Sequence, residues 1–501
     1  RHAGNSHDLL EVDAAANASI VFPRGAVWRP CCLRGEGKSA ESGALHRLYS
    51  NIMKKIAIIG GGAAGLAAAI AAGNELARLG AANECEIVLF EADPERVGRS
   101  ILATGNGRCN FSNAHIDPAC YRNADFVEAV LRSLARLSEA RVDGDAQPLG
   151  TYEAPAQGGA QPVSAFEAPV QRFFSSLGLM WREEGEGRMY PAANKASSVL
   201  EVLRAGAAAA QVRFAFGRTL SRIDAPTRAK GLFHLRFSDG SIEHADAVVV
   251  CVGGRAVSGV DFPAGIRVES TRPVLGPLAT DSRITRQLNN IRVKCAVSLE
   301  RSGSLVAREE GELLFRDYGV SGVCVFNLSR LAREGDVLSI DFLPHMLSAD
   351  RDAWLFARRK HLSARLGENG QIAAEDVLRG AMLPQVAQVL CKCAGIDSVR
   401  PFSKKDVLAL SRVIGGLRLT VRGIGDAKQC QVSRGGLSVA AFDPQTMEAV
   451  CASGLFAAGE ALDVDAPCGG YNLHWAWSSG LLAGVSAARS AVSANGEGKG
   501  K

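Results

Sequence analysis

The sequence predicts an α/β fold built around a parallel sheet, and three observations carry this prediction. An apolar, strand-like run over 55–59 leads directly into three glycines and then into an alanine-rich helical pattern over 63–79. A second apolar run follows over 86–90, and another lies near the far end of the chain over 454–458. Apolar strands that alternate with helices are typical of a parallel sheet covered on both faces.

Composition places the chain among ordinary globular proteins. Its 501 residues are 47% hydrophobic and 22% charged, which is enough to form the cores of two or three domains. The net charge is +5 and no long basic run occurs, so we expect no nucleic-acid partner. The 13 cysteines include no CxxC pair, which argues against a zinc site, and scattered thiols favour a cytoplasmic protein.

Residues 1–52 show no sustained periodicity, so we expect a disordered extension or a leader upstream of a start at Met53. The run 53–72 imitates a secretory signal, because two lysines precede an apolar stretch. Three glycines inside the run would weaken a signal helix, and we interpret it as the first strand and helix of the fold. No other stretch reaches the ~20 apolar residues of a membrane span, so we expect no membrane partner.

Further helices and strands follow from periodicity along the middle of the chain. The expected helices cover 126–137, 170–177 and 197–210, and the expected strands cover 233–237 and 245–252. The segment 138–168 is rich in Ala, Gly, Pro and Gln without any period, which predicts a mobile surface insertion.

Changes in the pattern divide the chain into parts. Short β pieces separated by turn residues begin after residue 272, as in a small barrel or sandwich, and a charged helical region follows them. The expected parts are a nucleotide-binding domain over 53–272, a barrel-like piece over 273–348, a helical domain over 349–399, a barrel return over 400–425, the last piece of the nucleotide-binding domain over 426–494 and a tail over 495–501.

The glycines Gly60, Gly62 and Gly65 form a G-x-G-x-x-G pattern between the first strand and the first helix. In this context the pattern indicates a dinucleotide site. Gly60 permits the tight turn, Gly62 lets the backbone approach a pyrophosphate, and Gly65 lets the helix press against the strand. The start of the helix, with Ala63 and Ala64, offers free N–H groups and a positive dipole end to the phosphates.

Acidic and glycine residues at two other places extend the expected site. Glu91 ends the second strand, where a carboxylate can accept hydrogen bonds from both ribose hydroxyls. Near the C-terminus a strand again delivers a glycine and an acid, and a second glycine turn opens a helix whose N–H groups can reach the flavin N1 and C2 carbonyl. This favours FAD over NAD as the bound dinucleotide. The residues expected at this end of the cofactor are Gly459, Glu460, Asp463, Gly470, Asn472 and Leu473.

Longer motifs accompany these residues: TGNGRCN over 104–110, GRMYP over 187–191, RGG over 434–436 and GGYNLHWAWSSG over 469–480. Together they resemble the bacterial flavoproteins often called BaiN-like, or aminoacetone oxidase-family FAD-binding enzymes. The resemblance covers most of 53–490. It implies an FAD-binding Rossmann-like domain of the two-dinucleotide flavoprotein type, with an inserted β-barrel domain and a small helical domain.

The resemblance also implies an NAD(P)/FAD-dependent oxidoreductase that acts on a small molecule, with FAD as cofactor and NAD(P)H as a further electron donor. One named member type reduces ring double bonds of oxo bile acids. The FAD contacts that the resemblance adds are Arg99, Thr104, Gly105, Asn106 and Gly253. The sequence departs from the family's pattern in a shortened loop over 255–264, in Val323 where a proline is usual, and in His474 where a glutamine is common.

Reduction of a double bond needs a proton donor besides the flavin, and His474, Tyr471 and Cys109 are the candidates. The ordinary pKa range of His474 suits proton transfer, although a structural histidine is the competing interpretation. Cys109 has no second cysteine four or five residues away, so a redox disulfide of the glutathione reductase type is not expected. Two alternatives stay open, an amine oxidase of the aminoacetone type and a non-catalytic or RNA-associated FAD-binding protein. The sequence does not predict an oligomeric state.

Overall fold

The computed structural model describes residues 53–140, 165–227, 231–366, 372–396 and 402–493. The expected N-terminal extension over 1–52, the C-terminal tail and most of the expected insertion over 138–168 lie outside these described residues.

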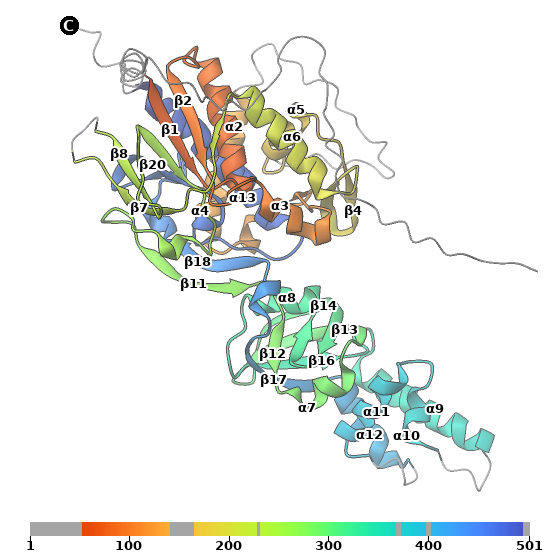
Figure 1. Ribbon diagram of the computed structural model, residues 1–501. Coiled ribbons are helices and arrows are strands. Elements are labelled where there is room, and N and C mark those ends of the chain that lie inside the picture. The colour runs from red at the N-terminus through yellow and green to blue at the C-terminus, as the bar shows by residue number, and fades with distance from the viewer. Residues whose placement is uncertain (1–52, 141–164, 228–230, 367–371, 397–401, 494–501) are drawn as a thin grey trace, which may run out of the picture. The chain divides into compact units, whose positions relative to one another are not determined.

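The centre of the nucleotide-binding part is a six-stranded sheet in the order β19-β20-β10-β1-β2-β6, of which Figure 1 labels β1, β2 and β20. Its strands are β1 (Lys54–Ile59), β2 (Cys85–Phe90), β6 (Arg213–Ala215), β10 (Ala247–Val250), β19 (Glu448–Ala449) and β20 (Ala452–Ala457). All neighbours pair in parallel except β19 with β20. The chain therefore leaves β1 toward β2 on one side and returns to it at β10 on the other. In such a sheet, ligands bind where the strand order reverses, at the carboxyl ends of β1 and β10.

One expected strand is shorter in the structure. The strand predicted over 245–252 is present as β10 (Ala247–Val250), and Ala245 instead ends a separate strand, β9 (Ile242–Ala245). The division falls at Asp246, whose carboxylate accepts a hydrogen bond from the backbone N–H of Lys55 at 2.8 Å. A strand change at this point lets β9 belong to a separate antiparallel sheet with β7 (Leu220–Asp224) and β8 (Phe233–Phe237).

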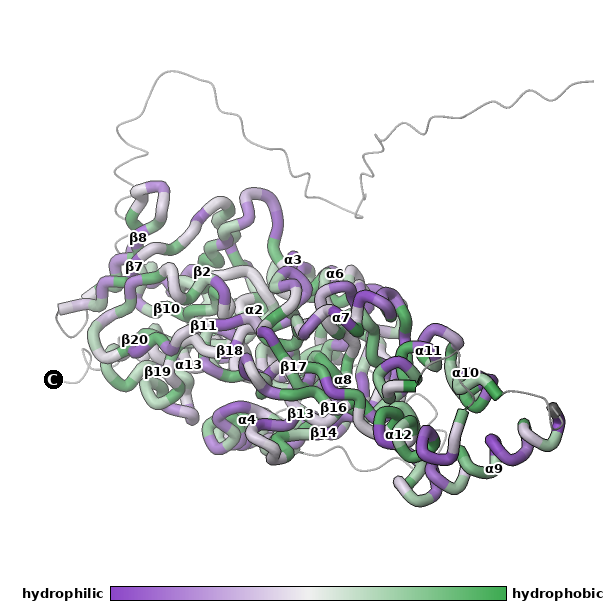
Figure 2. The backbone as a smooth tube through the Cα atoms, turned by 90° about the horizontal axis from the view of Figure 1, so that it is seen from below, coloured by the Kyte–Doolittle hydropathy of each residue, from purple (hydrophilic) through white to green (hydrophobic). Residues whose placement is uncertain are grey.

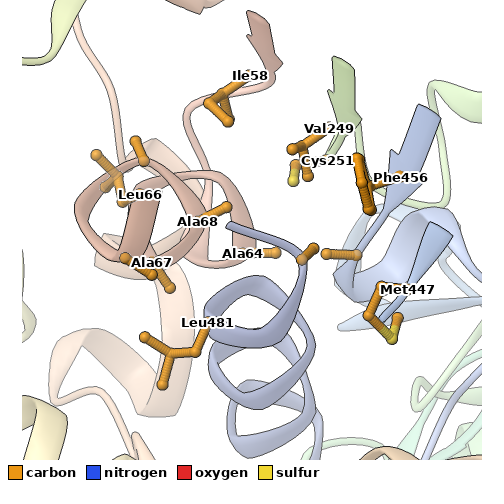
Figure 3. Packing of buried hydrophobic residues seen from close by; sticks show 14 of the residues in the cluster. Ile58, Ala64, Leu66, Ala67, Ala68, Val249, Cys251, Met447, Phe456 and Leu481 are labelled. Atoms are coloured by element: carbon orange, nitrogen blue, oxygen red, sulfur yellow. The ribbon is translucent and has the colours of Figure 1, made fainter. Parts of the chain in front are cut away.

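Two helices pack closely over the parallel sheet. They are α2 (Ala63–Arg78) and α13 (Tyr471–Ser493). Figure 3 shows Ala64 and Ala68 of α2 and Leu481 of α13 where the helices meet. A Cβ added at Gly480 would lie 2.4 Å from the carbonyl oxygen of Ala64, and one added at Gly484 would lie 2.1 Å from that of Ala68. Glycine is thus required at both positions, and the matching order of the contacts shows that the helices run in parallel.

The remaining helices of this part are α3 (Arg99–Ala103), α4 (Ala124–Glu139), α5 (Ala168–Ser176) and α6 (Ala196–Ala209). A small antiparallel sheet contains β3 (Ser112–Asn113), β4 (Trp181–Glu184) and β5 (Arg188–Pro191). A two-stranded ribbon of β11 (Val268–Val274) and β18 (Val432–Leu437) carries the chain out of the nucleotide-binding part and back into it.

Between the two ribbon strands the chain forms a closed six-stranded barrel, which confirms the barrel prediction. Its strands are β12 (Leu278–Thr280), β13 (Arg292–Arg301), β14 (Ser304–Arg316), β15 (Gly319–Ser321), β16 (Val337–Asp341) and β17 (Leu417–Ile424). The helices of this region are α7 (Ser282–Thr285), α8 (Val323–Ser329), α9 (Ser348–Leu366), α10 (Ala374–Leu378), α11 (Pro384–Cys393) and α12 (Lys404–Ile414).

The barrel and the four helices α9 to α12 share one hydrophobic core, which includes Leu338 of β16, Leu355 of α9 and Leu410 of α12. Figure 2 shows hydrophilic and hydrophobic stretches alternating along α9, as expected for a helix with one buried face. Among the described residues, no helix combines the length and the apolar character needed to cross a bilayer.

Candidate functional site

The first glycine turn has the geometry that the sequence pattern predicts. Gly60 has a φ of +104°, and a Cβ there would lie 2.4 Å from the carbonyl oxygen of Cys251. A Cβ at Gly65 would lie 1.8 Å from the carbonyl oxygen of Gly60. Contacts with the protein's own backbone therefore require glycine at both positions.

Gly62 differs from its two neighbours in the motif. It has an ordinary φ of −79°, and the nearest atom to an added Cβ is the Oγ of Ser100 at 3.5 Å. Gly62 caps the start of α2 without any side-chain hydrogen bond. The protein leaves open space at this position, and no side chain caps the first N–H groups of α2.

Glu91 lies beside the glycine turn. One oxygen of its carboxylate accepts from the backbone N–H of Gly61 at 2.7 Å, and the other accepts from that of Asp93 at 2.8 Å. These bonds fix the carboxylate at the end of β2, and each oxygen keeps a second lone pair. Arg99, by contrast, is mostly exposed and lies 3.7 Å from the Asp93 carboxylate.

The start of α13 is a second glycine turn. Gly470 has a φ of +99°, and a Cβ there would lie 2.2 Å from the carbonyl oxygen of Ser112 and 3.0 Å from the Oδ1 of Asn110. That Oδ1 is buried and has no hydrogen-bond partner in the protein. The side chain of Asn472 bonds back to both the N–H and the C=O of Ala466, so it holds the preceding loop.

The structure brings the two glycine motifs together. A Cβ at Gly459 would lie 2.7 Å from the Cβ of Ala64, and the N–H of Gly459 donates to the Oγ of Ser479 at 2.9 Å. Because Gly480 lies against Ala64, the start of α13 extends roughly 14 Å along its axis beyond this contact, at about 1.5 Å per residue. The N-termini of α2 and α13 therefore point in the same direction, and they lie at different positions along that direction.

Other predicted residues have protein partners of their own. The Glu460 carboxylate accepts from the N–H of Ser433 at 2.7 Å, and Asp463 accepts from Gly435 and from Arg122. The Oγ1 of Thr104 donates to the carbonyl of Ile101. The other predicted contacts are described by their backbone. Gly105 and Asn106 both have left-handed φ, and an added Cβ at Gly253 would have nothing within 4 Å.

These observations fit an FAD molecule. The space at Gly62 and the uncapped start of α2 suit a pyrophosphate, and Glu91 suits a ribose. The unpaired Oδ1 of Asn110 beside Gly470 suits a hydrogen-bond donor of a ligand, since a buried acceptor is rarely left without a partner. The N–H groups at the start of α13 suit the polar edge of the isoalloxazine.

Comparison with known proteins identifies the family. A family model described as the HI0933-like protein Rossmann domain matches residues 159–486, more than half of the chain. The chain belongs to the HI0933-like family. This assignment makes it an FAD-binding flavoprotein oxidoreductase and agrees with the family resemblance drawn from the motifs.

Members of known activity are similar over nearly their whole length. The 3-dehydro-bile acid delta(4,6)-reductase of Clostridium scindens is 30% identical over 456 residues, which cover 87% of this chain and 99% of that protein. The ribosomal RNA dihydrouridine synthase of Escherichia coli K12 is 26% identical, over a region that covers 84% of this chain and 95% of that protein. Among solved structures, an open flavocytochrome c3 fumarate reductase is 14% identical with a TM-score of 0.39, over 92% of this chain and 83% of that chain.

The three proton-donor candidates of this HI0933-like protein lie in different surroundings. His474 is fully buried, its Nδ1 lies 2.9 Å from the Oγ of Ser112, and burial lowers its pKa to about 3. Its imidazolium form is therefore not populated near neutral pH. Cys109 is also fully buried, and burial raises its pKa to about 11.

Tyr471 is only partly buried, and its hydroxyl donates to the carbonyl of His115 at 2.8 Å. Burial raises its pKa to about 12, with Cys120 as a further contributor. The phenol therefore keeps its proton at any physiological pH. Of the three candidates, Tyr471 is the one that lies at the start of α13 with partial exposure.

Two residues beside the glycine turns were missed by the sequence reasoning. Asn110 belongs to the TGNGRCN motif, but only the structure reveals its unpaired oxygen. Cys468 directly precedes Gly469, its N–H donates to the Oδ1 of Asn327, and burial raises its pKa to about 12. Its place immediately before the second glycine pair was the available signal.

Replacement of Glu460 by Gln is expected to change how stability depends on pH. Burial raises the pKa of Glu460 to about 7, opposed by the N–H of Ser433 and by Arg255. The folded protein therefore keeps a proton that the unfolded chain, with a pKa of about 4.3, has released. Between those two values the folded state loses stability as the pH rises, and the loss is on the order of 3 kcal/mol.

Urea denaturation at pH 5 and pH 8 checks this expectation. Glu460→Gln should lose less stability over that interval than the wild type, whereas a substitution of the exposed Glu334 by Gln should leave the dependence unchanged. Equal pH dependence in all three proteins would contradict the role assigned to burial of Glu460.

Proposed function

We propose that this protein uses FAD to reduce a carbon–carbon double bond conjugated to a carbonyl in a small organic substrate, with NAD(P)H as the electron donor. The observation that carries the proposal is the similarity to a delta(4,6)-reductase over 99% of that protein's length. The names of the bile acid reductase and of the two dihydrouridine synthases describe this kind of chemistry, because dihydrouridine is uridine with its ring double bond hydrogenated.

Different residues of this chain would bind different parts of the cofactor. The start of α2 would bind the pyrophosphate, with Gly62 giving it room, and Glu91 would accept from the ribose. The N–H groups at the start of α13, together with Asn110, would hold the polar edge of the flavin ring. When bound, FAD supplies the two-electron redox chemistry of the reaction.

The protein must also provide a proton to the second carbon of the double bond. We assign this task to the region around the second glycine turn, where Tyr471 and Cys468 hold protons on either side of Gly469 and Gly470. Both have pKa values raised by burial to about 12, so each is protonated at neutral pH. Tyr471→Phe and Cys468→Ser, assayed separately, decide which of the two supplies it.

A uridine in ribosomal RNA is the second candidate substrate, because two similar proteins are named ribosomal RNA dihydrouridine synthases. The expectation that this chain has no nucleic-acid partner therefore stays a prediction. Membership of an oxidoreductase family argues for an enzyme rather than a non-catalytic flavin-binding protein. The amine oxidase alternative stays a prediction that the same experiment tests.

Anaerobic flavin spectroscopy tests the proposed function. The purified protein is expected to be yellow, to bleach with NADH or NADPH, and to recover its colour when a 3-oxo-Δ4 steroid is added. Recovery with ribosomal RNA transcripts and not with the steroid would favour the second candidate. A flavin that neither nicotinamide reduces, but that an amine reduces with peroxide formed in air, would contradict the proposal.

A further inference from the structure

Four arginines gather where the ribbon meets the loop that leads into α13. Arg272 on β11 and Arg434 on β18 are direct cross-strand partners in the ribbon. Arg330 follows α8, and Arg122 precedes α4. The buried carboxylates of Asp463 and Asp465 accept hydrogen bonds from Arg122, Arg330 and Arg434.

Both carboxylates already accept several hydrogen bonds from protein donors. Asp465 accepts from the Nε of Arg330 at 2.7 Å and from Arg434 at 2.7 and 2.8 Å. Asp463 accepts from the Nε of Arg122 at 2.8 Å and from the backbone N–H of Gly435 at 2.9 Å. Two carboxylates thus neutralise only part of the charge of four guanidinium groups.

Arg272 is the arginine left without an acid. It donates to the backbone carbonyl of Arg330 at 2.9 Å and forms no ion pair with any residue that the structure describes. Burial and the nearby Arg434 lower its pKa. Arg434, directly opposite Arg272 on the paired strand, has its charge met by the Asp465 carboxylate, whereas Arg272 feels that carboxylate only from a distance, so an anion bound at Arg272 would relieve the remaining repulsion between the two guanidinium groups.

The cluster is joined to the proposed flavin site by a short piece of chain. Asp465 lies on the loop that ends in Gly469 and Gly470, and its backbone carbonyl accepts from the N–H of Arg122 at 2.8 Å. Arg330 also donates to the carbonyl of Cys120, whose neighbour Tyr121 bonds through its hydroxyl to the carbonyl of Tyr471. An anion bound at Arg272 would therefore be held beside the loop that positions the start of α13.

We propose that Arg272 and Arg434, supported by Arg122 and Arg330, form a subsite for an oxyanion carried by a ligand of the enzyme. Guanidinium groups bind carboxylate and phosphate alike, so the oxyanion is either the carboxylate of the organic substrate or a phosphate of the nicotinamide nucleotide. This inference rests on the proposed function only for the identity of these two sources.

Equilibrium binding to the oxidised, FAD-loaded protein tests the subsite without requiring turnover. The probes are a 3-oxo-Δ4 steroid carboxylic acid, its methyl ester, NADPH and NADH, and the readout is the flavin absorbance change on titration. Arg272→Gln removes the charge, Arg272→Lys keeps it without the fork of donors, and Arg267→Gln is the matched control. Arg267 immediately precedes β11 and already pairs with Glu269 at 3.0 Å.

The carboxylate source predicts that the wild type binds the acid more tightly than the ester and that Arg272→Gln weakens the acid about tenfold to hundredfold, with the ester unchanged. The phosphate source predicts the same loss for the nicotinamide nucleotides instead. The affinity of Arg272→Lys for the affected probe should lie between those of the wild type and Arg272→Gln. The affinities of Arg267→Gln should match those of the wild type.

Equal affinities of wild type and Arg272→Gln for every probe would overturn the subsite, as would a wild type that binds none of them. Loss of salt-sensitive binding to a uridine-containing RNA in Arg272→Gln, with all small probes unaffected, would also overturn it. Failure of the proposed function would appear in the anaerobic reduction experiment, as a flavin that NAD(P)H does not reduce. The binding constants of the probes would still be measurable in that case.

Discussion

The Gly62→Val protein should fold normally and be colourless. A valine at this position meets no backbone atom, since the nearest neighbour of an added Cβ is the Ser100 hydroxyl at 3.5 Å, and the φ of −79° suits any residue. The same side chain would occupy the space through which a pyrophosphate approaches the start of α2. We expect loss of nearly all bound FAD, measured as the flavin absorbance per protein after purification.

Two further measurements make this test specific. Circular dichroism and the urea midpoint should show that Gly62→Val remains folded. Gly185→Val is the matched control, because an added Cβ at Gly185 has nothing within 4 Å and its φ is not left-handed, and this variant should stay yellow. A fully yellow Gly62→Val protein would show that the cofactor lies elsewhere.

Replacing Gly484 by Val should destabilise the protein by about 3 kcal/mol, because overpacking a closely packed contact forces the backbone to move. An added Cβ would lie 2.1 Å from the carbonyl oxygen of Ala68 and 2.8 Å from its C and Cα atoms, so α2 and α13 would have to separate. Intrinsic helix propensity would act in the opposite direction, since valine is a better helix former than glycine.

The free energy of unfolding from urea denaturation measures this effect. Ser490→Val, on a partly exposed position of the same helix, is the control and should change stability by less than about 0.5 kcal/mol. An equally stable Gly484→Val protein would mean that the two helices do not need their close contact.

The nucleotide-binding elements were predictable because their signals are local. The predicted strand 55–59 and helix 63–79 correspond to Lys54–Ile59 and Ala63–Arg78, and Gly80 just beyond the helix has the positive φ of a helix stop. A continuous apolar strand, a glycine turn and an alanine-rich helix each leave a pattern within a dozen residues. The closed barrel was predictable only as a class, from short strands between turns.

What could not be predicted depends on residues far apart in the sequence. β11 pairs with β18 across more than 150 residues, so nothing local announces that Arg272 and Arg434 face each other. The ordinary pKa range of histidine made His474 a proton-donor candidate. The structure instead buries it against Ser112, and the helical face that becomes buried is set by tertiary packing rather than by the helix itself.

The parallel contact of α2 with α13 has a consequence for synthesis of the protein. α2 is synthesised well before α13, and its alanine face lacks this packing partner until α13 has emerged from the ribosome. Until then the sheet also lacks β20, which pairs with β10, the strand that lies next to β1. Until α13 has formed, the chain therefore lacks the second glycine turn that would hold the flavin end of the cofactor.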